Sequence, residues 1–213
     1  MFSTIPPATR SILAANIAVF LLEVTGSIRI ASLWALWPLG PHFRPWQLLT
    51  YGFLHAGPAH LFYNMFALFL FGTILERIVG GNKFLLIYFS AGLLGSLATL
   101  PLYAASLGAS GAIFGVMGTV AVLRPRMVVY VSYVPMPMIV AAFVWALMDL
   151  VGFFVPSGVA NAAHLAGLGL GILAGLYLKN TYGEVAEPKR NLPKVPEEKM
   201  RRWENLWLIG KKA

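Results

Sequence analysis

Six long apolar segments run through this chain, and they constrain its fold more than any other feature. Only 11% of the 213 residues are charged, whereas 58% are hydrophobic. A soluble domain carries about 25% charged residues, so this chain has too few charges to cover a surface that faces water. We therefore expect lipid to surround most of it and predict an all-α membrane protein.

The apolar segments predict six membrane-spanning helices packed as one bundle. We place them at about residues 11–25, 58–77, 83–102, 108–123, 137–154 and 161–178. Pro58 suits a first helical position, where its missing N–H is no loss. Pro135 and Pro137 disturb the region that follows Pro125, so the fifth helix is expected to begin only at residue 137.

The chain is expected to divide into a six-span membrane domain at residues 1–180 and a basic tail at residues 181–213. Eight of the sixteen Lys and Arg residues lie between Lys189 and Lys212. With six spans both termini share one side, and the positive-inside rule places that side in the cytoplasm. Residues 196–209 read equally well as an amphipathic helix on anionic lipid or as a disordered tail.

The distribution of basic residues is uneven in this chain of net charge +8, because half of them lie in that tail. It therefore indicates contact with the membrane surface and not with nucleic acid. The absence of cysteine excludes disulfides, thiol nucleophiles and thiolate metal sites. The N-terminus lacks signal-peptide and transit-peptide features, so the compact form favours a multi-pass protein of a prokaryotic plasma membrane. The oligomeric state is left open.

Polar residues from three predicted helices fall in one layer of the outer leaflet. Residues 108–123 make about 24 Å of helix, which is shorter than the hydrocarbon core of about 30 Å, so Ser110 should lie below the outer surface. His164 is about one turn into the sixth helix, and His60 and Asn64 occupy the first turns of the second. Polar groups in lipid are costly and usually functional.

Ser110 and His164 together suggest acyl-transfer chemistry, because a serine hydroxyl needs a base to become a good nucleophile. Gly111 in the fourth helix and Gly167 and Gly171 in the sixth would let the two helices approach closely. Each residue also has a structural interpretation. A serine is often a small residue in a packing groove, and a histidine can hydrogen-bond a neighbouring helix.

Other polar residues have supporting interpretations. His60 and Asn64 share one helical face and could donate hydrogen bonds to an oxyanion, or could bond neighbouring helices. His55 is expected to brace the loop before the second helix. Asp149 lies near the outer end of the fifth helix, so a triad is possible. No acid is placed convincingly beside His164, however, and we predict a Ser-His dyad.

Glu76 lies at the inner end of the second helix, too deep to take part in the chemistry. We expect it to pair locally, either with Arg77 or with the loop that leads to the third helix.

Three motifs in matching order resemble the rhomboid family of intramembrane serine proteases. They are His55-x4-His60-x3-Asn64, Gly108-Ala109-Ser110-Gly111, and Ala163-His164-Leu165-Ala166-Gly167 followed by Gly171. The resemblance covers about residues 11–179. It implies a six-helix fold, no cofactor or metal, and cleavage of single-span membrane proteins near the outer face.

The same resemblance assigns roles to residues. It makes Ser110 the nucleophile and His164 the general base and then the acid, with His60, Asn64 and the Ser110 N–H as the oxyanion hole. It also makes residues 26–57 a loop inserted sideways into the membrane, and the fifth helix with residues 152–158 a mobile gate.

Two positions depart from the common family pattern. The Trp-Arg pair frequent in the first loop is Trp46-Gln47 here, so an arginine-centred brace is missing and the loop should be less stable. The aromatic residue four positions after the serine, often tyrosine, is Phe114. Its ring can stack on His164 but cannot donate a hydrogen bond.

Three other functions compete with a protease. A catalytically silent relative that binds membrane proteins would not need both Ser110 and His164. A small transporter would carry polar groups through both leaflets and inverted repeats, whereas the polar residues here crowd one layer. A zinc peptidase could use three histidines, but the chain has no His-Glu-x-x-His motif.

Overall fold

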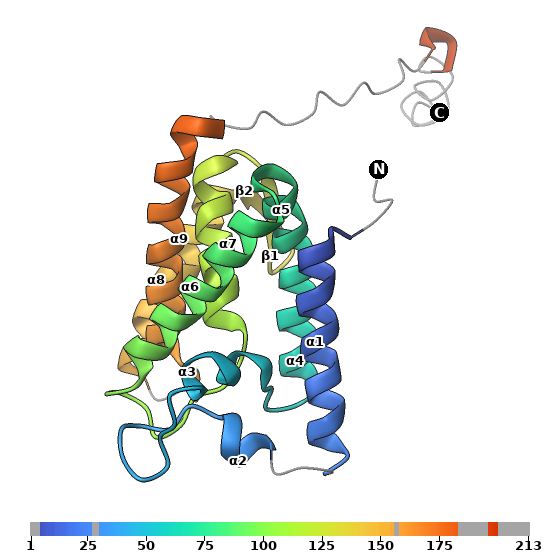
Figure 1. Ribbon diagram of the computed structural model, residues 1–213. Helices are drawn as coiled ribbons and strands as arrows, with labels where there is room; N and C mark the ends of the chain where they lie inside the picture. The colour runs from blue at the N-terminus through green and yellow to red at the C-terminus, as the bar shows by residue number, and fades with distance from the viewer. Residues whose placement is uncertain (1–4, 27–29, 156–157, 183–195, 200–213) are drawn as a thin grey trace, which may run out of the picture.

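The computed structural model describes residues 5–26, 30–155, 158–182 and 196–199. These residues form a bundle of helices with one small hairpin (Figure 1). The elements in chain order are α1 (Pro7–Val24), α2 (Ile30–Trp34), α3 (Gln47–Thr50), η1 (Tyr51–Phe53), α4 (Pro58–Ala67), η2 (Leu68–Gly72), α5 (Thr73–Val79), α6 (Gly81–Thr99), α7 (Ser110–Leu123), β1 (Val128–Val131), β2 (Val134–Pro137), α8 (Met138–Phe154) and α9 (Asn161–Tyr182).

Each predicted apolar segment contains a helix, with ends that shift by a few residues. Among the described residues, three helical stretches are long and apolar enough to cross a membrane: Pro7–Val24, Pro58–Val79 and Asn161–Tyr182. The second includes the π-helical turn η2 between α4 and α5. Helices α7 and α8 are apolar but shorter. The chain is thus mostly helical, while the count of six spans stays a prediction.

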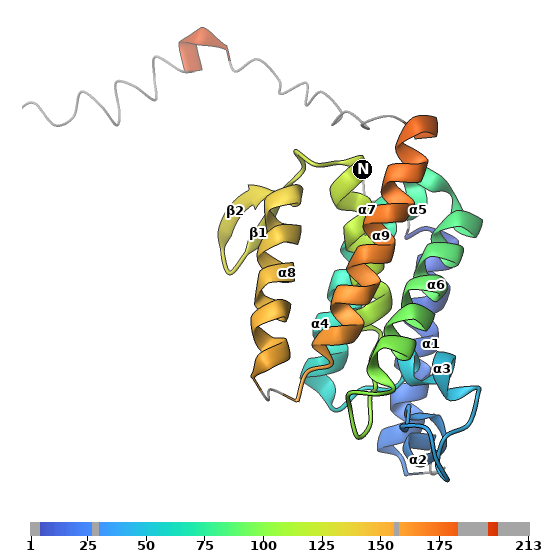
Figure 2. The same ribbon diagram turned by 90° about the vertical axis from the view of Figure 1, so that its left-hand side faces the viewer.

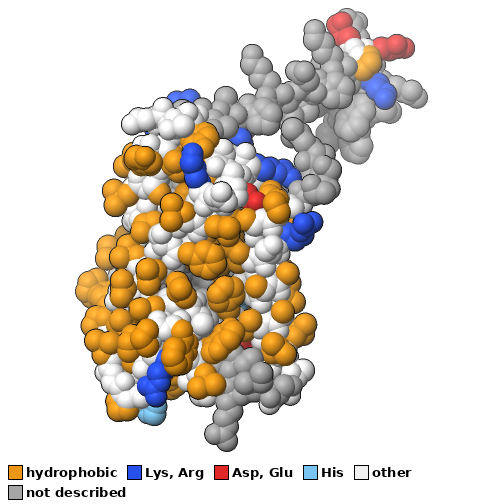
Figure 3. Space-filling model, in the orientation of Figure 1, with side chains coloured by type: hydrophobic (Ala, Val, Ile, Leu, Met, Phe, Trp, Pro, Cys, Tyr) orange, Lys and Arg blue, Asp and Glu red, His pale blue; other side chains and the backbone are white. Residues whose placement is uncertain are grey.

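Charged side chains gather at the ends of the bundle and hydrophobic ones cover its sides (Figure 3). The start of α1 and the end of α9 lie at the same end of the molecule, and α2 and α3 lie at the opposite end (Figure 1). This distribution fits a body surrounded by lipid. The basic tail from residue 183 onward lies outside the described residues, apart from residues 196–199. The amphipathic helix expected at residues 196–209 therefore lies mostly outside them as well.

A two-stranded hairpin departs from the predicted all-α fold. Strands β1 and β2 pair antiparallel, with Val128 opposite Pro137 and Tyr130 opposite Pro135, and they lie beside α8 (Figure 2). The prolines that delay the fifth helix therefore belong to a strand. They are tolerated there because each strand of a two-stranded sheet is an edge strand.

Helix α7 occupies the centre of the bundle and packs closely against α9. A Cβ atom on Gly167 would overlap the carbonyl oxygen of Gly111, and one on Gly171 would overlap that of Gly115. Between these helices the Thr119 hydroxyl donates to the carbonyl oxygen of Gly171 at 2.9 Å. Lipid provides little hydrophobic drive for helix association, so such close contacts between small residues hold the pair together.

Glu76 bonds the start of α1, a partner that the prediction of local pairing did not include. Its carboxylate accepts hydrogen bonds from the backbone N–H groups of Ala8 (2.9 Å) and Thr9 (2.7 Å) and from the Thr9 hydroxyl (2.7 Å). These donors belong to the first turn of α1, where backbone N–H groups have no partner within the helix and a negative charge is favourable. Glu76 therefore fastens α1 to α5.

Gln47 braces the loop that joins α1 to α4. Its side chain is 1% exposed. The amide oxygen accepts from the Arg44 N–H at 3.0 Å, and the amide nitrogen donates to the carbonyls of His42 (3.1 Å) and Leu33 (3.3 Å). The missing arginine brace is thus replaced by a neutral amide that satisfies several backbone groups of the loop.

Adding one methyl group at Gly171 should loosen the bundle. The Gly171→Ala variant would force α9 away from Gly115, and overpacking of this kind costs about 1–3 kcal/mol. We expect a lower unfolding temperature in detergent micelles, measured by circular dichroism.

The matched control is Gly169→Ala on the same helix. Nothing lies within 4 Å of a Cβ atom built there, and alanine favours helix over glycine by about 1 kcal/mol. The control should therefore be neutral or stabilising. Equal losses in both variants would mean that the α7–α9 contact does not limit stability.

Candidate active site

Ser110 and His164 meet where α7 and α9 begin. The Ser110 Oγ lies 2.7 Å from the Nε2 atom of His164, although 54 residues separate them in sequence. Both side chains are partly buried, and Ser110 is the first residue of α7. A hydroxyl that donates to an imidazole can lose its proton as it attacks a carbonyl carbon.

Hydrogen bonds to neighbouring segments fix the backbone that precedes Ser110. The Gly108 N–H donates to the carbonyl oxygen of Tyr51 at 2.9 Å, and the Tyr51 hydroxyl donates to the Gly92 carbonyl oxygen at 2.8 Å. Gly108 has a φ of +121°, and a Cβ atom there would lie 2.9 Å from the His60 ring. Only glycine suits this position, for both backbone and steric reasons.

Phe114 fixes the plane of the His164 ring. The two rings are parallel within 7°, with their centroids 4.3 Å apart. Phe114 is one turn along α7 from Ser110, so the stack belongs to the same helix as the hydroxyl. The contact requires an aromatic face and no phenolic oxygen.

His60 and Asn64 belong to α4 and lie beside the start of α7, where Ser110 is. The Ala56 N–H donates to the His60 Nδ1 atom at 3.2 Å, which leaves Nε2 as the protonated nitrogen on the side of Gly108. The Asn64 amide donates one hydrogen bond to the carbonyl oxygen of His60 at 2.9 Å. Asn64 and Ser110 line the same cavity.

An acid does lie beside His164, where the sequence left a triad with Asp149 possible but favoured a dyad. The Oδ1 atom of Asp149 is 2.8 Å from the His164 Nδ1 atom. The signal was present in the sequence, because a carboxylate in an apolar helix demands a partner. The rotation of the fifth helix, which decides whether Asp149 faces the sixth, was not available from the sequence.

His55 lies behind the site and does not reach Ser110 directly. Its side chain is 3% exposed, and its ring meets the His60 ring edge to face with centroids 5.1 Å apart. Burial, and next the neighbouring His60 imidazole, lower the pKa of His55 to about 4. His55 is therefore neutral near pH 7 and packs as an uncharged ring.

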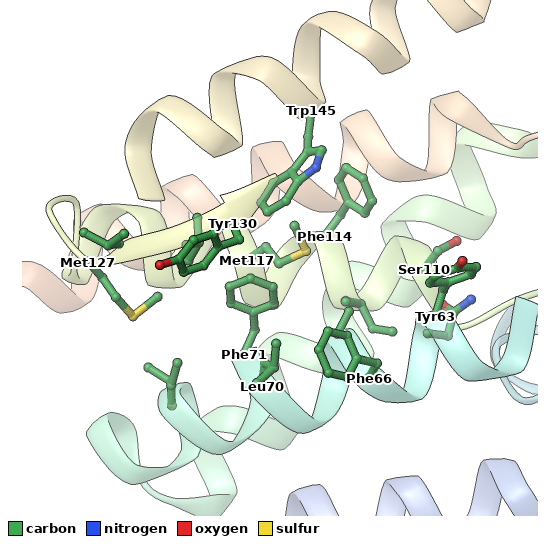
Figure 4. A pocket seen from close by; sticks show the side chains of 16 residues that line it. Tyr63, Phe66, Leu70, Phe71, Ser110, Phe114, Met117, Met127, Tyr130 and Trp145 are labelled. Carbon is green, nitrogen blue, oxygen red and sulfur yellow. The ribbon is translucent and has the colours of Figure 1, made fainter. Parts of the chain in front are cut away.

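A cavity of about 570 Å³ extends from Ser110 along α7. Figure 4 shows Ser110 and Tyr63 at one end and Met127 and Tyr130 toward the other. Trp145 from α8 meets Phe71 from η2 edge to face, at 6.1 Å between ring centroids. The side chains that line this cavity are largely aromatic and aliphatic, as is usual for a site that takes an apolar ligand.

Comparisons with known proteins agree with the motifs. The family described as "Rhomboid domain" matches residues 42–181. The chain is 36% identical to YdcA of Bacillus subtilis over 131 residues, 60% of this chain and 64% of that protein. It is 38% identical to rhomboid protease GluP of the same organism over 139 residues, 62% of this chain and 26% of that protein.

A third relative is more distant. Rhomboid protease GlpG of Klebsiella pneumoniae is 28% identical over 169 residues, 78% of this chain and 61% of that protein. The chain thus spans less than two thirds of the length of each of these relatives. The family match covers more than half of this chain, which therefore belongs to the rhomboid family of membrane proteins.

The buried neutral state of His55 predicts a pH-dependent stability. The unfolded chain, with an ordinary histidine pKa of about 6.5, takes up a proton that the folded protein excludes until about pH 4. The contribution of neutral His55 to the free energy of unfolding is fully present above pH 6.5. It falls by up to about 3 kcal/mol as the pH is lowered toward 4. Thermal unfolding at several pH values in detergent measures this loss.

The His55→Gln variant should reduce the loss of stability between pH 6.5 and 4, whatever its stability at neutral pH. The control is His42→Gln, which changes an exposed loop histidine and should leave the pH dependence as it is in the wild type. A pH dependence that survives in His55→Gln would contradict the buried neutral ring.

Proposed function

We propose that this protein is an intramembrane serine endopeptidase that works with a Ser110–His164 dyad. The observation that carries the proposal is the 2.7 Å contact between the Ser110 hydroxyl and the imidazole Nε2 atom. The names of two relatives, GluP and GlpG, describe them as rhomboid proteases, which supports the same activity for this chain.

The reaction follows from the two side chains. The Ser110 Oγ attacks the carbonyl carbon of a peptide bond while His164 takes the hydroxyl proton at Nε2. His164 then gives that proton to the departing amine, and the C–N bond breaks to leave an ester on Ser110. Water, deprotonated by His164, hydrolyses the ester and restores the hydroxyl.

An oxyanion hole stabilises the negative charge that develops on the carbonyl oxygen. His60 can donate from Nε2, because its Nδ1 atom accepts from Ala56. Asn64 has a second amide hydrogen beyond the one it gives to the His60 carbonyl. The Ser110 N–H at the start of α7 adds a third donor, favoured by the helix dipole.

The substrates proposed are single-span membrane proteins that enter from the lipid. The apolar cavity next to Ser110 would receive part of the polypeptide near the cleaved bond. We further propose six spans in the domain of residues 1–180, with both termini and the basic tail in the cytoplasm. Cleavage then occurs near the outer face of a prokaryotic plasma membrane, without a cofactor.

Replacement of either dyad member should abolish proteolysis. Ser110→Ala removes the attacking oxygen and His164→Ala removes its base, so cleavage of a reconstituted single-span substrate should fall below detection in both variants. A fluorophosphonate should label the wild type and should not label Ser110→Ala.

Two controls change matched side chains elsewhere in the molecule. Ser96→Ala alters a buried serine whose hydroxyl bonds only locally to the Leu93 carbonyl, and His42→Ala alters an exposed loop histidine. Both should keep cleavage activity. A wild type without activity or labelling would favour a silent membrane-binding relative, and cleavage by Ser110→Ala would refute the nucleophile.

The Asn64→Ala variant tests the oxyanion hole. Loss of one such donor costs about 10²–10³ in kcat, because the hydrogen bond is strongest in the transition state. KM should change little, since the ground-state carbonyl gains less from the amide. Steady-state kinetics of cleavage measure both constants. A variant with raised KM and normal kcat would assign Asn64 to substrate binding instead.

A further inference from the structure

Helix α8 is attached to the bundle unevenly along its length. Its buried residues are Met138, Ala141 and Ala142 near its start and then Asp149 alone. The side chains that surround Asp149 on α8 are apolar and exposed: Met148 is 63% exposed and Leu150 is 49% exposed. In the second half of α8, therefore, the side chain that turns into the protein is a carboxylate.

That carboxylate is directed at the proposed base. Asp149 Oδ1 lies 2.8 Å from the His164 Nδ1 atom, and the exposed fractions of the two side chains are 9% and 12%. The Ser110 hydroxyl donates a hydrogen bond to the Nε2 atom. The ring proton is therefore on Nδ1, and this N–H donates a hydrogen bond to Asp149. The three side chains come from α8, α9 and α7.

The surroundings of the imidazole offer no equivalent to Asp149 among the described residues. Phe114 covers one face of the ring, and it restrains tilting but not the choice of protonated nitrogen. The His60 ring lies against Gly108, but an imidazole carries no negative charge and cannot stabilise the positive charge of an imidazolium. Asp149 alone combines hydrogen-bond acceptance with negative charge.

We propose that Asp149 is a positioning residue that completes the site through His164, and the inference rests on the proposed function. The carboxylate holds the imidazole with Nε2 toward Ser110 and stabilises the imidazolium formed when Ser110 loses its proton. Asp149 itself touches no reacting atom. Since it is on α8, full reactivity of Ser110 requires α8 to lie against α9.

This role predicts a defect in chemistry and not in binding. The Asp149→Asn variant keeps the size of the side chain and removes its charge. We expect kcat for a single-span substrate to fall by up to about 10⁴-fold, the loss that follows the same change in a Ser-His-Asp triad, with KM within about two-fold of the wild type. The rate of Ser110 labelling by a small fluorophosphonate should fall in parallel, because labelling needs the same base but no helical substrate.

The control for position on α8 is Met148→Ala, which changes an exposed neighbour and should keep wild-type kcat and labelling. Thermal unfolding in detergent shows that the variants are folded. If Asp149→Asn labels at the wild-type rate, the proposal is wrong, and so it is if only KM rises. Those results would leave the dyad intact, whereas a wild type that is never labelled would overturn the proposed function itself.

A second pair of variants covers the case in which Asp149→Asn does not fold. Asp149→Glu and Asp149→Gln have equal length, and both displace the polar group by one methylene. The Glu variant should label at least about five times faster than the Gln variant, because only the former keeps the charge. Equal labelling rates in this pair would show that the carboxylate does not act through His164.

Discussion

The close packing of α7 against α9 is the contact on which the candidate site depends. Gly167 and Gly171 present bare backbone to the carbonyl oxygens of Gly111 and Gly115, and the two helices cannot approach so closely with larger residues. Ser110 begins α7 one residue before Gly111, and His164 precedes Gly167 by less than a turn. The same packing therefore fixes both the helix spacing and the 2.7 Å contact between hydroxyl and imidazole.

Polar side chains attach the more peripheral elements to this central pair. Glu76 binds the first turn of α1, Gln47 ties together the loop before α4, and Asp149 joins α8 to α9. Each of these residues is buried. Because an unsatisfied polar group in lipid or protein interior is costly, each bond also specifies one arrangement of the elements that it joins.

The sequence allowed the helices to be predicted, because apolar length and proline positions act locally. Helix starts at Pro58 and Asn161 agree with the structure. The bonds of Glu76 to α1 and of Asp149 to His164 were not predicted, because they depend on how the helices are rotated toward each other. The hairpin of residues 128–137 was not foreseen either. Its apolar residues resemble those of a helix, and only the pairing of β1 with β2, with Tyr130 opposite Pro135, shows that they form strands.

The three helices that carry Ser110, His164 and Asp149 differ in how firmly they are held. Helix α7 is buried along most of its length, whereas α8 buries four of its 17 residues. The hydroxyl and the imidazole are thus preorganised by rigid backbone contacts, which is what efficient general-base catalysis requires. The carboxylate depends on a helix with a mostly lipid-facing surface. Under the proposed function, such a site would keep the hydroxyl and the imidazole aligned while α8 adjusts to an apolar polypeptide in the adjoining cavity.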